Sequence, residues 1–367
     1  MRKDNQTIVI TGGHHNSALV LARRLRKKGL NIIWIGHRYS MWGDTALSAE
    51  YREVASEGIK FIELRAGKFY RTYHPLKLIR IPLGFFQALW ILLKIHPQGV
   101  VSFGGYLAVP VVIAAWILGI PVITHEQTAI SGYANRLIGF FSRKIAVSWP
   151  SSLAYYPPGK TLLTGLPLRP EITAAKADRL KNLSGIKSSK IKTVLVTGGK
   201  QGSHAINNCI FSSLPDLLHR FNIIHQTGSS TIFNDFKTAQ KIRKDLTLEQ
   251  QSKYLVYDYI SSENLRTILS QVSLVVSRAG AHIIYELAYL GIPAVLIPIP
   301  QSSHSEQNAN ARILISSGQA VLLEQKDLSP ESLSRKLDEA LTLSPEPIVL
   351  ETGSEDKLEK LIFSEIV

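Results

Sequence analysis

Cysteine and metal-binding motifs are nearly absent from this 367-residue chain. Its single cysteine, Cys209, excludes a disulfide framework and a cysteine-based zinc site, and is typical of a reducing cytosol. No Asp-x-Asp pair, HExxH segment or cluster of Cys and His occurs, so the sequence predicts no metal site. The start of the chain is charged and then briefly apolar up to a glycine pair, unlike a secretory signal peptide.

Long apolar runs are also missing. The nearest to a membrane span is the segment 106–123, which Pro110, Gly119 and Pro121 interrupt. We expect a buried helix followed by a buried strand there.

Acidic residues are scarce in the first half of the chain. Residues 1–165 contain 20 Lys and Arg against 7 Asp and Glu, and no acidic residue occurs between Glu63 and Glu126. Residues 166–367 contain 22 Lys and Arg against 21 Asp and Glu, so nearly all of the net charge of +14 lies in the first half. A one-sided basic field attracts anionic surfaces, either nucleic acid or anionic lipid. Aromatic residues are not interleaved with the basic ones as in RNA-binding motifs, so we expect no nucleic acid partner.

Short apolar runs alternate with helical patterns, which predicts an α/β protein with parallel sheets and crossover helices. The expected strands are residues 8–10, 31–35, 99–103, 121–124, 144–148, 192–196, 222–225, 274–277 and 294–297. The pattern that starts at residue 8 starts again at residue 193, which predicts two Rossmann-like units. Pro and Gly cluster between residues 150 and 167 and predict a boundary there. After Leu341 the chain is polar and ends in a predicted helix at 356–366.

Each predicted unit opens with a glycine pair after its first strand. Gly12 and Gly13 precede His14, which could act as a base near neutral pH or lie in an ordinary turn. His15 is an alternative base. The loop 197–203, TGGKQGS, lies between a strand and a helix, as a phosphate-binding loop does, but also fits a structural turn.

Three further segments allow two interpretations each. Glu286, in the helix after the strand 274–277, could accept hydrogen bonds from a ribose diol or be a solvated helical glutamate. The amide-rich segment 301–312 could recognise sugar hydroxyls or be a solvated loop. The segment 70–94 combines aromatic and basic residues without an acid, which suits a membrane interface or a buried helix with cations at its margin.

Four blocks, taken in order, resemble glycosyltransferase family 28, and in particular the MurG-type N-acetylglucosaminyltransferases of bacterial peptidoglycan synthesis. The blocks are TGGH at 11–14, the segment 102–150, TGGKQGSHAIN at 197–207, and SRAGAHIIYELAYLGIPAVLIPIP at 277–300 with EQNANAR at 306–312. TGLPLR at 164–169 resembles the family's interdomain segment. Thr128 stands where the family usually has Asn, and Lys200 where Ser is usual.

The resemblance implies a GT-B fold, with two Rossmann-like domains whose parallel sheets face a cleft. It also implies an inverting transfer of N-acetylglucosamine from UDP-N-acetylglucosamine to lipid I, giving lipid II. We expect an acceptor- and membrane-binding domain over residues 1–163, a UDP-sugar-binding domain over 164–345, and a tail at 346–367 that packs back on the N-terminal domain. No cofactor is expected beyond the substrate, and no metal.

The resemblance also assigns roles to individual residues. His14 would be the catalytic base. The donor side would comprise Arg169, Gly199, Lys200, Gln201, Gly202, Ala281, Ile283, Glu286 and Gln307. The acceptor side would comprise Gly12, Gly13, Tyr106, His125, Glu126, Gln127, Thr128 and Asn135. The membrane patch would comprise Leu76, Ile79, Arg80, Phe86 and Trp90.

The implied partners are a UDP-sugar, a lipid-linked acceptor, the anionic inner leaflet and proteins of cell division or elongation. The implied location is peripheral, at the cytoplasmic face of the plasma membrane. Three alternatives stay open: a related transferase for another lipid acceptor, a non-catalytic UDP-sugar-binding protein, and a UDP-sugar epimerase of related fold.

Overall fold

The protein is described by a computed structural model that covers residues 6–39, 47–67, 80–185, 191–300 and 305–367. The chain divides into two compact units. Unit 1 comprises Met1–Arg169 and Glu351–Val367, and unit 2 comprises Pro170–Leu350. The chain therefore leaves unit 1 at Arg169 and re-enters it at Glu351.

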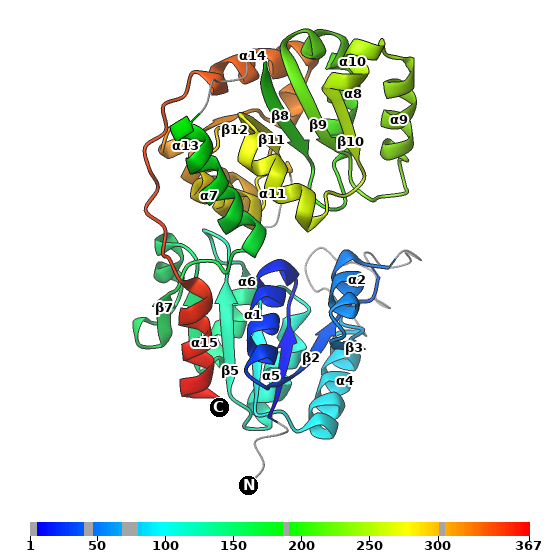
Figure 1. The fold of residues 1–367 in the computed structure, drawn as a ribbon. Helices are drawn as coiled ribbons and strands as arrows, with labels where there is room; N and C mark the ends of the chain where they lie inside the picture. Colours follow the sequence, from blue (N-terminus) through cyan, green and yellow to red (C-terminus); the bar gives the residue numbers. More distant parts are fainter. Residues whose placement is uncertain (1–5, 40–46, 68–79, 186–190, 301–304) are drawn as a thin grey trace. The chain divides into compact units, whose positions relative to one another are not determined.

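Unit 1 is built on a seven-stranded sheet in the order β3-β2-β1-β4-β5-β6-β7, with every neighbouring pair parallel (Figure 1). Its strands are β1 (Thr7–Thr11), β2 (Asn31–Gly36), β3 (Lys60–Glu63), β4 (Gly99–Ser102), β5 (Val122–Glu126), β6 (Lys144–Val147) and β7 (Thr161–Leu163). The strand order reverses between β1 and β4. In open parallel sheets, ligands bind outside the carboxyl ends of the strands at such a reversal.

Helices cover both faces of this sheet, because successive side chains of a strand point to opposite faces. Ile8 and Ile10 belong to a core formed with α1 (His15–Lys27), α2 (Ala49–Ser56) and α15 (Ser354–Glu365). Val9 belongs to the opposite core, formed with α4 (Arg80–Ile95), α5 (Ala108–Ile117) and α6 (Tyr133–Phe141). Helix α15, coloured red in Figure 1, packs beside α1 from the other end of the sequence.

Unit 2 repeats the same topology with a six-stranded parallel sheet in the order β10-β9-β8-β11-β12-β13. Its strands are β8 (Lys192–Thr197), β9 (Phe221–Gln226), β10 (Tyr254–Tyr257), β11 (Leu274–Ser277), β12 (Ala294–Leu296) and β13 (Ala320–Leu322). Its helices are α7 (Pro170–Gly185), α8 (His204–Arg220), α9 (Asp235–Asp245), α10 (Leu248–Lys253), α11 (Ser262–Gln271), α12 (Ala281–Leu290), α13 (Glu306–Ser316) and α14 (Pro330–Leu341). The reversal lies between β8 and β11, so both units present the same kind of ligand edge.

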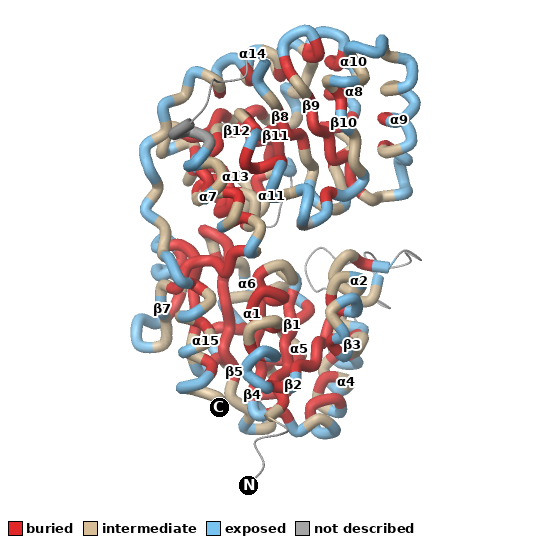
Figure 2. The backbone as a smooth tube through the Cα atoms, viewed as in Figure 1, coloured by how far each residue is buried: buried red, intermediate tan, exposed pale blue. Residues whose placement is uncertain are grey.

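All of the predicted strands are confirmed. Four further strands, β3, β7, β10 and β13, were not predicted from the sequence. These are the edge strands of the two sheets. Figure 2 shows the buried centre of each sheet in red. A central strand such as β1 is buried throughout, whereas β3 and β7 contain no buried residue, so their sequences carry a weaker apolar signal.

The segment 106–123 forms a helix and the start of a strand, as predicted, rather than a membrane span. Within the described ranges, no helix is long and apolar enough to cross a membrane.

Candidate functional site

The first glycine loop lies at the reversal point of unit 1, between β1 and α1. Gly12 has a φ of +135°, and a Cβ there would lie 2.6 Å from the carbonyl carbon of Phe103, so only glycine fits. The backbone N–H of Gly13 donates to the carbonyl oxygen of Gly104 at 3.0 Å. The loop after β1 is thus joined to the loop after β4, and His14 follows directly at the start of α1.

The two neighbouring histidines have different surroundings. His15 Nε2 lies 3.2 Å from a carboxylate oxygen of Glu53 on α2. Burial lowers the pKa of His14 below that of an ordinary histidine; Glu126 raises that pKa and His15 lowers it further. His14 is therefore a neutral imidazole at physiological pH, the form that can accept a proton.

The carboxylate of Glu126, at the end of β5, lies inside a cage of hydrogen-bond donors. Oε1 accepts from the backbone N–H of Gln127 (2.9 Å), the backbone N–H of Thr128 (3.1 Å) and the Thr128 hydroxyl (2.8 Å). Oε2 accepts from Asn135 Nδ2 (2.9 Å) and the Tyr156 hydroxyl (2.9 Å). Only 1% of Glu126 is exposed, and these bonds offset the cost of burying its charge.

Asn135 connects this cage to the loop after β4. Its Oδ1 accepts from the backbone N–H of Gly105 at 2.8 Å, while its Nδ2 donates to Glu126. A Cβ on Gly104 would lie 2.6 Å from the same Oδ1, so the loop packs tightly on the amide. Glu126 thus holds Asn135, Asn135 holds the Gly104-Gly105 loop, and that loop accepts a hydrogen bond from Gly13.

Other residues predicted for the acceptor side lie at different depths. His125 is buried, its Nε2 lies 2.9 Å from the Gly165 carbonyl oxygen, and burial lowers its pKa to about 4. Gln127 is fully buried, and neither atom of its amide bonds to a described residue. Tyr106 is exposed. The structure thus brings these residues together at one sheet edge, with His125 and Gln127 beneath the surface.

Two residues near this edge were missed by the sequence analysis. Tyr156 donates to Glu126, lies 2.6 Å from the Ser131 hydroxyl, and has its pKa raised by burial and by Glu126. Burial raises the pKa of Glu50, on α2, to about 7, although the Trp34 indole N–H donates to it at 2.6 Å. Neither residue lies in a motif, and only the fold brings them to the site.

Part of the predicted membrane patch can be placed. Leu76 and Ile79 lie outside the described residues, and Arg80 begins α4. Phe86 and Trp90 on α4 are exposed by 63% and 61%. Helix α4 is therefore not the buried helix of the alternative interpretation; it buries one side and exposes aromatic residues on the other.

The second glycine loop lies at the reversal point of unit 2. Gly202 has a φ of +82°, and a Cβ there would lie 1.9 Å from the carbonyl oxygen of Thr227. Gly199 also has a positive φ (+86°), but a Cβ there would meet nothing. Gly228 packs against Gly202 in turn, and the backbone N–H of Ser229 donates to the Lys200 carbonyl oxygen at 3.0 Å. The loop is pinned to the end of β9.

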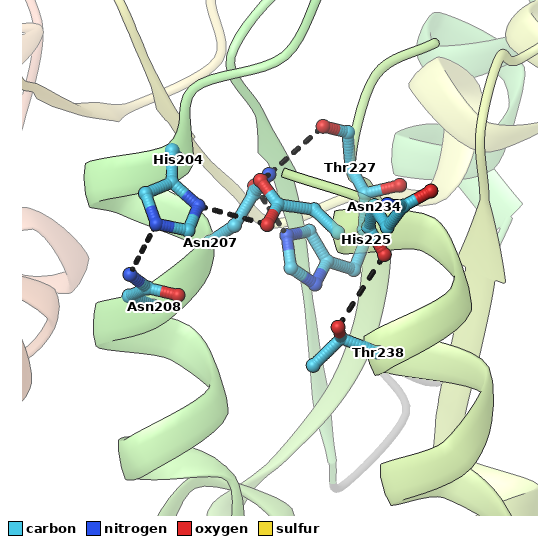
Figure 3. A network of polar contacts seen from close by, with 8 residues as sticks. His204, Asn207, Asn208, His225, Thr227, Asn234 and Thr238 are labelled. Carbon is cyan, nitrogen blue, oxygen red and sulfur yellow. Dashed lines mark hydrogen bonds and ion pairs between the residues drawn. The ribbon is translucent and has the colours of Figure 1, made fainter. Parts of the chain in front are cut away.

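A polar network behind the loop fixes Thr227 (Figure 3). Asn207 on α8 donates to the Thr227 carbonyl oxygen (2.9 Å) and to Asp235 (2.7 Å), and its Oδ1 lies 3.0 Å from His225 Nε2. His204 Nδ1 lies 2.8 Å from Asp235. Burial lowers the pKa of His225 to about 3, so this ring is neutral and its Nε2 carries the proton donated to Asn207.

The helix after β11 carries the carboxylate predicted to bind a ribose. Glu286 on α12 is only 5% exposed, which contradicts the alternative of a solvated glutamate. Ala281 is buried and Ile283 half-buried in the first turn of the same helix. This turn follows β11 closely, so the unpaired backbone N–H groups of a helix start lie at the carboxyl edge of the sheet.

Arg278, between β11 and α12, was not predicted as a site residue. Its guanidinium donates to the carbonyl oxygens of Ile297 (3.0 Å) and Pro298 (3.2 Å), the Ser203 hydroxyl (2.7 Å) and Gln325 (2.6 Å). All of these acceptors are uncharged. Because Ser203 ends the glycine loop, Arg278 places a positive charge beside that loop.

Further predicted donor residues lie around these loops. Gln307 on α13 accepts from the backbone N–H of Ile299 at 3.0 Å, and Asn310 Nδ2 donates to the Ala279 carbonyl oxygen at 3.3 Å. Helix α13 is thus joined to the loop after β11. Lys200 and Gln201 lie in the glycine loop itself, whereas Arg169 is the last residue of the first segment of unit 1. Within the described residues, no group of three or more His, Cys, Asp or Glu could hold a metal ion.

Both halves of the chain match models of one protein family. Residues 8–147 match the glycosyltransferase family 28 N-terminal domain, and residues 193–361 match the family 28 C-terminal domain. A Clostridium tetani relative is 34% identical over 340 residues, covering 90% of this chain and 88% of the relative. A Clostridium botulinum relative is 35% identical over 333 residues, covering 89% of this chain and 88% of the relative. Both are named UDP-N-acetylglucosamine–N-acetylmuramyl-(pentapeptide) pyrophosphoryl-undecaprenol N-acetylglucosamine transferase.

Solved structures share the fold. Acinetobacter baumannii MurG superposes with a TM-score of 0.66 at 23% identity, covering 98% of this chain and 99% of that one. The UDP-GlcNAc 2-epimerase of Neisseria meningitidis superposes with a TM-score of 0.58 at 14% identity, covering 97% of this chain and 99% of that one. These likenesses show the GT-B fold, which transferases and epimerases both use.

Proposed function

Because this chain belongs to glycosyltransferase family 28, we propose that it transfers N-acetylglucosamine from UDP-N-acetylglucosamine to the lipid-linked muramyl pentapeptide, giving lipid II. Support comes from relatives at 34–35% identity over nine-tenths of the chain, all named for this reaction. The structural observation that carries the proposal is that the family's donor blocks converge at one sheet edge of unit 2. The loop 198–202, Arg278 and α12 follow β8 and β11, which are adjacent strands.

In this proposal unit 2 binds the donor. The pyrophosphate lies on the glycine loop at the N-terminus of α8, where backbone N–H groups point outward. Lys200 and Arg278 add positive charge, and Arg169 adds more from the connecting segment. Glu286 accepts hydrogen bonds from the ribose hydroxyls, the first turn of α12 at Ala281 and Ile283 contacts uracil, and Gln307 binds the sugar.

Unit 1 binds the acceptor and starts the reaction. The acceptor hydroxyl oxygen attacks the anomeric carbon, and the bond from this carbon to the β-phosphate oxygen breaks. The electron pair leaves on UDP, whose charge the loop and the three cations Lys200, Arg278 and Arg169 stabilise. His14 takes the hydroxyl proton, because its depressed pKa keeps it neutral. Attack opposite the leaving group inverts the anomeric centre.

The acceptor is embedded in a membrane, so the enzyme must reach a lipid surface. Helix α4 exposes Phe86 and Trp90, and the first half of the chain carries the excess of positive charge. We infer that α4 docks on the anionic cytoplasmic face of the plasma membrane. Flotation with anionic vesicles tests this: Phe86→Asp with Trp90→Asp should abolish binding, and retained binding would place the docking element elsewhere.

The transfer is tested with radiolabelled UDP-N-acetylglucosamine and three acceptor conditions. Label should enter the lipid fraction with lipid I, and not with another polyprenyl-linked acceptor. Transfer to the other acceptor alone would identify a different transferase, and a changed sugar with donor alone would identify an epimerase. Binding without any product would leave only a UDP-sugar-binding protein.

Matched variants test the roles of the two candidate side chains. His14→Ala should lower turnover at least about 100-fold, whereas His15→Ala should not. Glu286→Ala should weaken UDP binding in calorimetry, whereas Glu263→Ala, an exposed carboxylate on α11, should leave it unchanged. The reverse pattern in either pair would remove that role.

A further inference from the structure

Unit 1 contains a cavity of about 490 Å³ at the edge of the sheet opposite to its glycine loop. Thr7, Asn31 and Lys60 line it at the starts of β1, β2 and β3, and Trp90 and Lys94 line it from the last turns of α4. Ligands of the transfer reaction bind at the other ends of these strands. The cavity therefore has no part in the proposed donor or acceptor sites, and its volume is in the range of small-molecule sites.

The lining of the cavity is amphipathic. Ile33, Ile62 and Ile91 give it an apolar floor, while the exposed ammonium groups of Lys60 and Lys94 lie at its rim. None of the lining residues is acidic, and among the described residues neither lysine has a carboxylate partner. Such a lining favours a ligand with an anionic group joined to an apolar part.

The cavity is continuous with the exposed face of α4. Leu83, Phe86, Trp90 and Leu93 are spaced as one helical face and are exposed by 58%, 63%, 61% and 47%. Trp90 belongs to both features, and Lys94 Nζ lies 5.1 Å from the centre of its ring. An indole and a lysine one turn apart are typical of the headgroup level of a membrane. A bilayer in contact with the α4 face would therefore bring its phosphates to the rim of the cavity.

We propose that this cavity binds the headgroup of an anionic phospholipid. The phosphate lies at the rim between the ammonium groups of Lys60 and Lys94, the carbon atoms of its head alcohol contact the isoleucine floor, and the acyl chains stay in the bilayer. The site gives α4 a specific contact in addition to apolar insertion. This inference rests on the proposed function, which places the acceptor in an anionic leaflet.

The first test is flotation of the full-length protein with vesicles of phosphatidylcholine containing phosphatidylglycerol, without donor or acceptor. Each lysine near an anionic surface contributes about a fivefold increase in affinity, so Lys60→Met with Lys94→Met should weaken binding roughly 25-fold. Lys60→Arg with Lys94→Arg should restore most of it. The matched control is Lys27→Met with Lys360→Met, which removes the same charge from α1 and α15, on the opposite face of the sheet. An equal loss in this control would overturn the site, because overall charge alone would then explain binding.

The second test titrates the protein with dihexanoyl-phosphatidylglycerol below its micelle concentration. Binding at Trp90 is measured as the difference in tryptophan fluorescence between the wild type and Trp90→Phe. We expect one saturable site that the double Lys→Met variant lacks. Equal affinity for dihexanoyl-phosphatidylcholine would overturn the role of the anionic headgroup. Equal affinity for glycerol phosphate would reassign the cavity to a soluble phosphate ester.

The transfer assay separates this inference from the proposed function. With a short-chain, water-soluble acceptor, the double Lys→Met variant should turn over at the wild-type rate. If the double Lys→Met variant binds vesicles as the wild type does, the cavity proposal alone is overturned. If the wild type binds phosphatidylglycerol but transfers no sugar, the proposed function alone is overturned.

Discussion

Two glycines of the second loop allow a prediction in which each substitution serves as control for the other. Gly199 and Gly202 have nearly the same positive φ, +86° and +82°. An added Cβ meets nothing at Gly199, but at Gly202 it lies 1.9 Å from the Thr227 carbonyl oxygen. Gly199→Ala therefore adds backbone strain only, whereas Gly202→Ala adds the same strain and a steric overlap.

The magnitudes follow from this geometry. A left-handed conformation costs a non-glycine residue about 1–2 kcal/mol, which is the destabilisation expected for Gly199→Ala. Because Cβ contacts closer than 3.0 Å do not occur, Gly202 and Thr227 must separate by about 1 Å in the second variant. Overpacking of this kind costs about 1–3 kcal/mol more, so Gly202→Ala should lose about 2–5 kcal/mol in total. Both variants should stay folded, since domains are stable by about 5–15 kcal/mol.

Urea unfolding measures the stability loss, and calorimetry with UDP measures the effect on the site. Movement of the loop should remove one or two backbone hydrogen bonds to the phosphates, and Gly202→Ala should therefore weaken UDP binding about 10- to 100-fold. Gly199→Ala should bind UDP more tightly than Gly202→Ala does. Equal unfolding free energies and equal UDP affinities for the two variants would refute the claim that close packing on Thr227 shapes the phosphate site.

Three further predictions concern unit 1. The pKa of the Glu50 carboxyl group is about 7 in the folded protein and lower in the unfolded chain, so the free energy of unfolding of the wild type falls as pH rises from about 4.5 to 7. In urea unfolding, Glu50→Gln should therefore be more stable than the wild type by up to about 3 kcal/mol at pH 8. This gain should be lost at about pH 4.5. Tyr156→Phe removes a donor to a buried carboxylate and should lower the unfolding free energy by about 1.5–3 kcal/mol, whereas Tyr155→Phe should change it by less than about 0.5 kcal/mol. Because the pKa of His14 is depressed, the acidic limb of the profile of kcat/KM against pH should lie below 6.5 and vanish in His14→Ala; a limb that persists in this variant would mean that another group acts as base.

Local patterns were enough to predict the core of each sheet and the positions of the glycine loops. Strands such as β1 and β8 are apolar because they are central, and a glycine pair after a strand is visible in the sequence itself. The edge strands carry a weaker signal, since β3, β7 and β10 each contain an exposed residue and β13 is only three residues long. The predicted helix at the end of the chain is confirmed as α15, starting at Ser354.

The contacts that shape the candidate site were less predictable, because they join residues far apart in the sequence. Tyr156 reaches Glu126 across 30 positions, and Ser203 reaches Arg278 across 75. Thr128, which departs from the family pattern, donates through its hydroxyl to Glu126 or to the Ile130 carbonyl oxygen. The sequence identified the substitution, but only the folded chain shows that the new side chain bonds to the buried carboxylate.

The return of the chain to unit 1 has a consequence for how the protein is made. Leu358 and Ile362 of α15 are fully buried in the core that contains β1, and Glu359 pairs with Arg24. A ribosome synthesises β1 first and α15 last, with all of unit 2 in between. Unit 1 therefore begins to emerge before unit 2 but is completed after it, and part of its core stays uncovered until α15 has been synthesised. A stop codon before Ser354 should thus destabilise unit 1, most of which is encoded far upstream, more than unit 2, which is translated just before this codon.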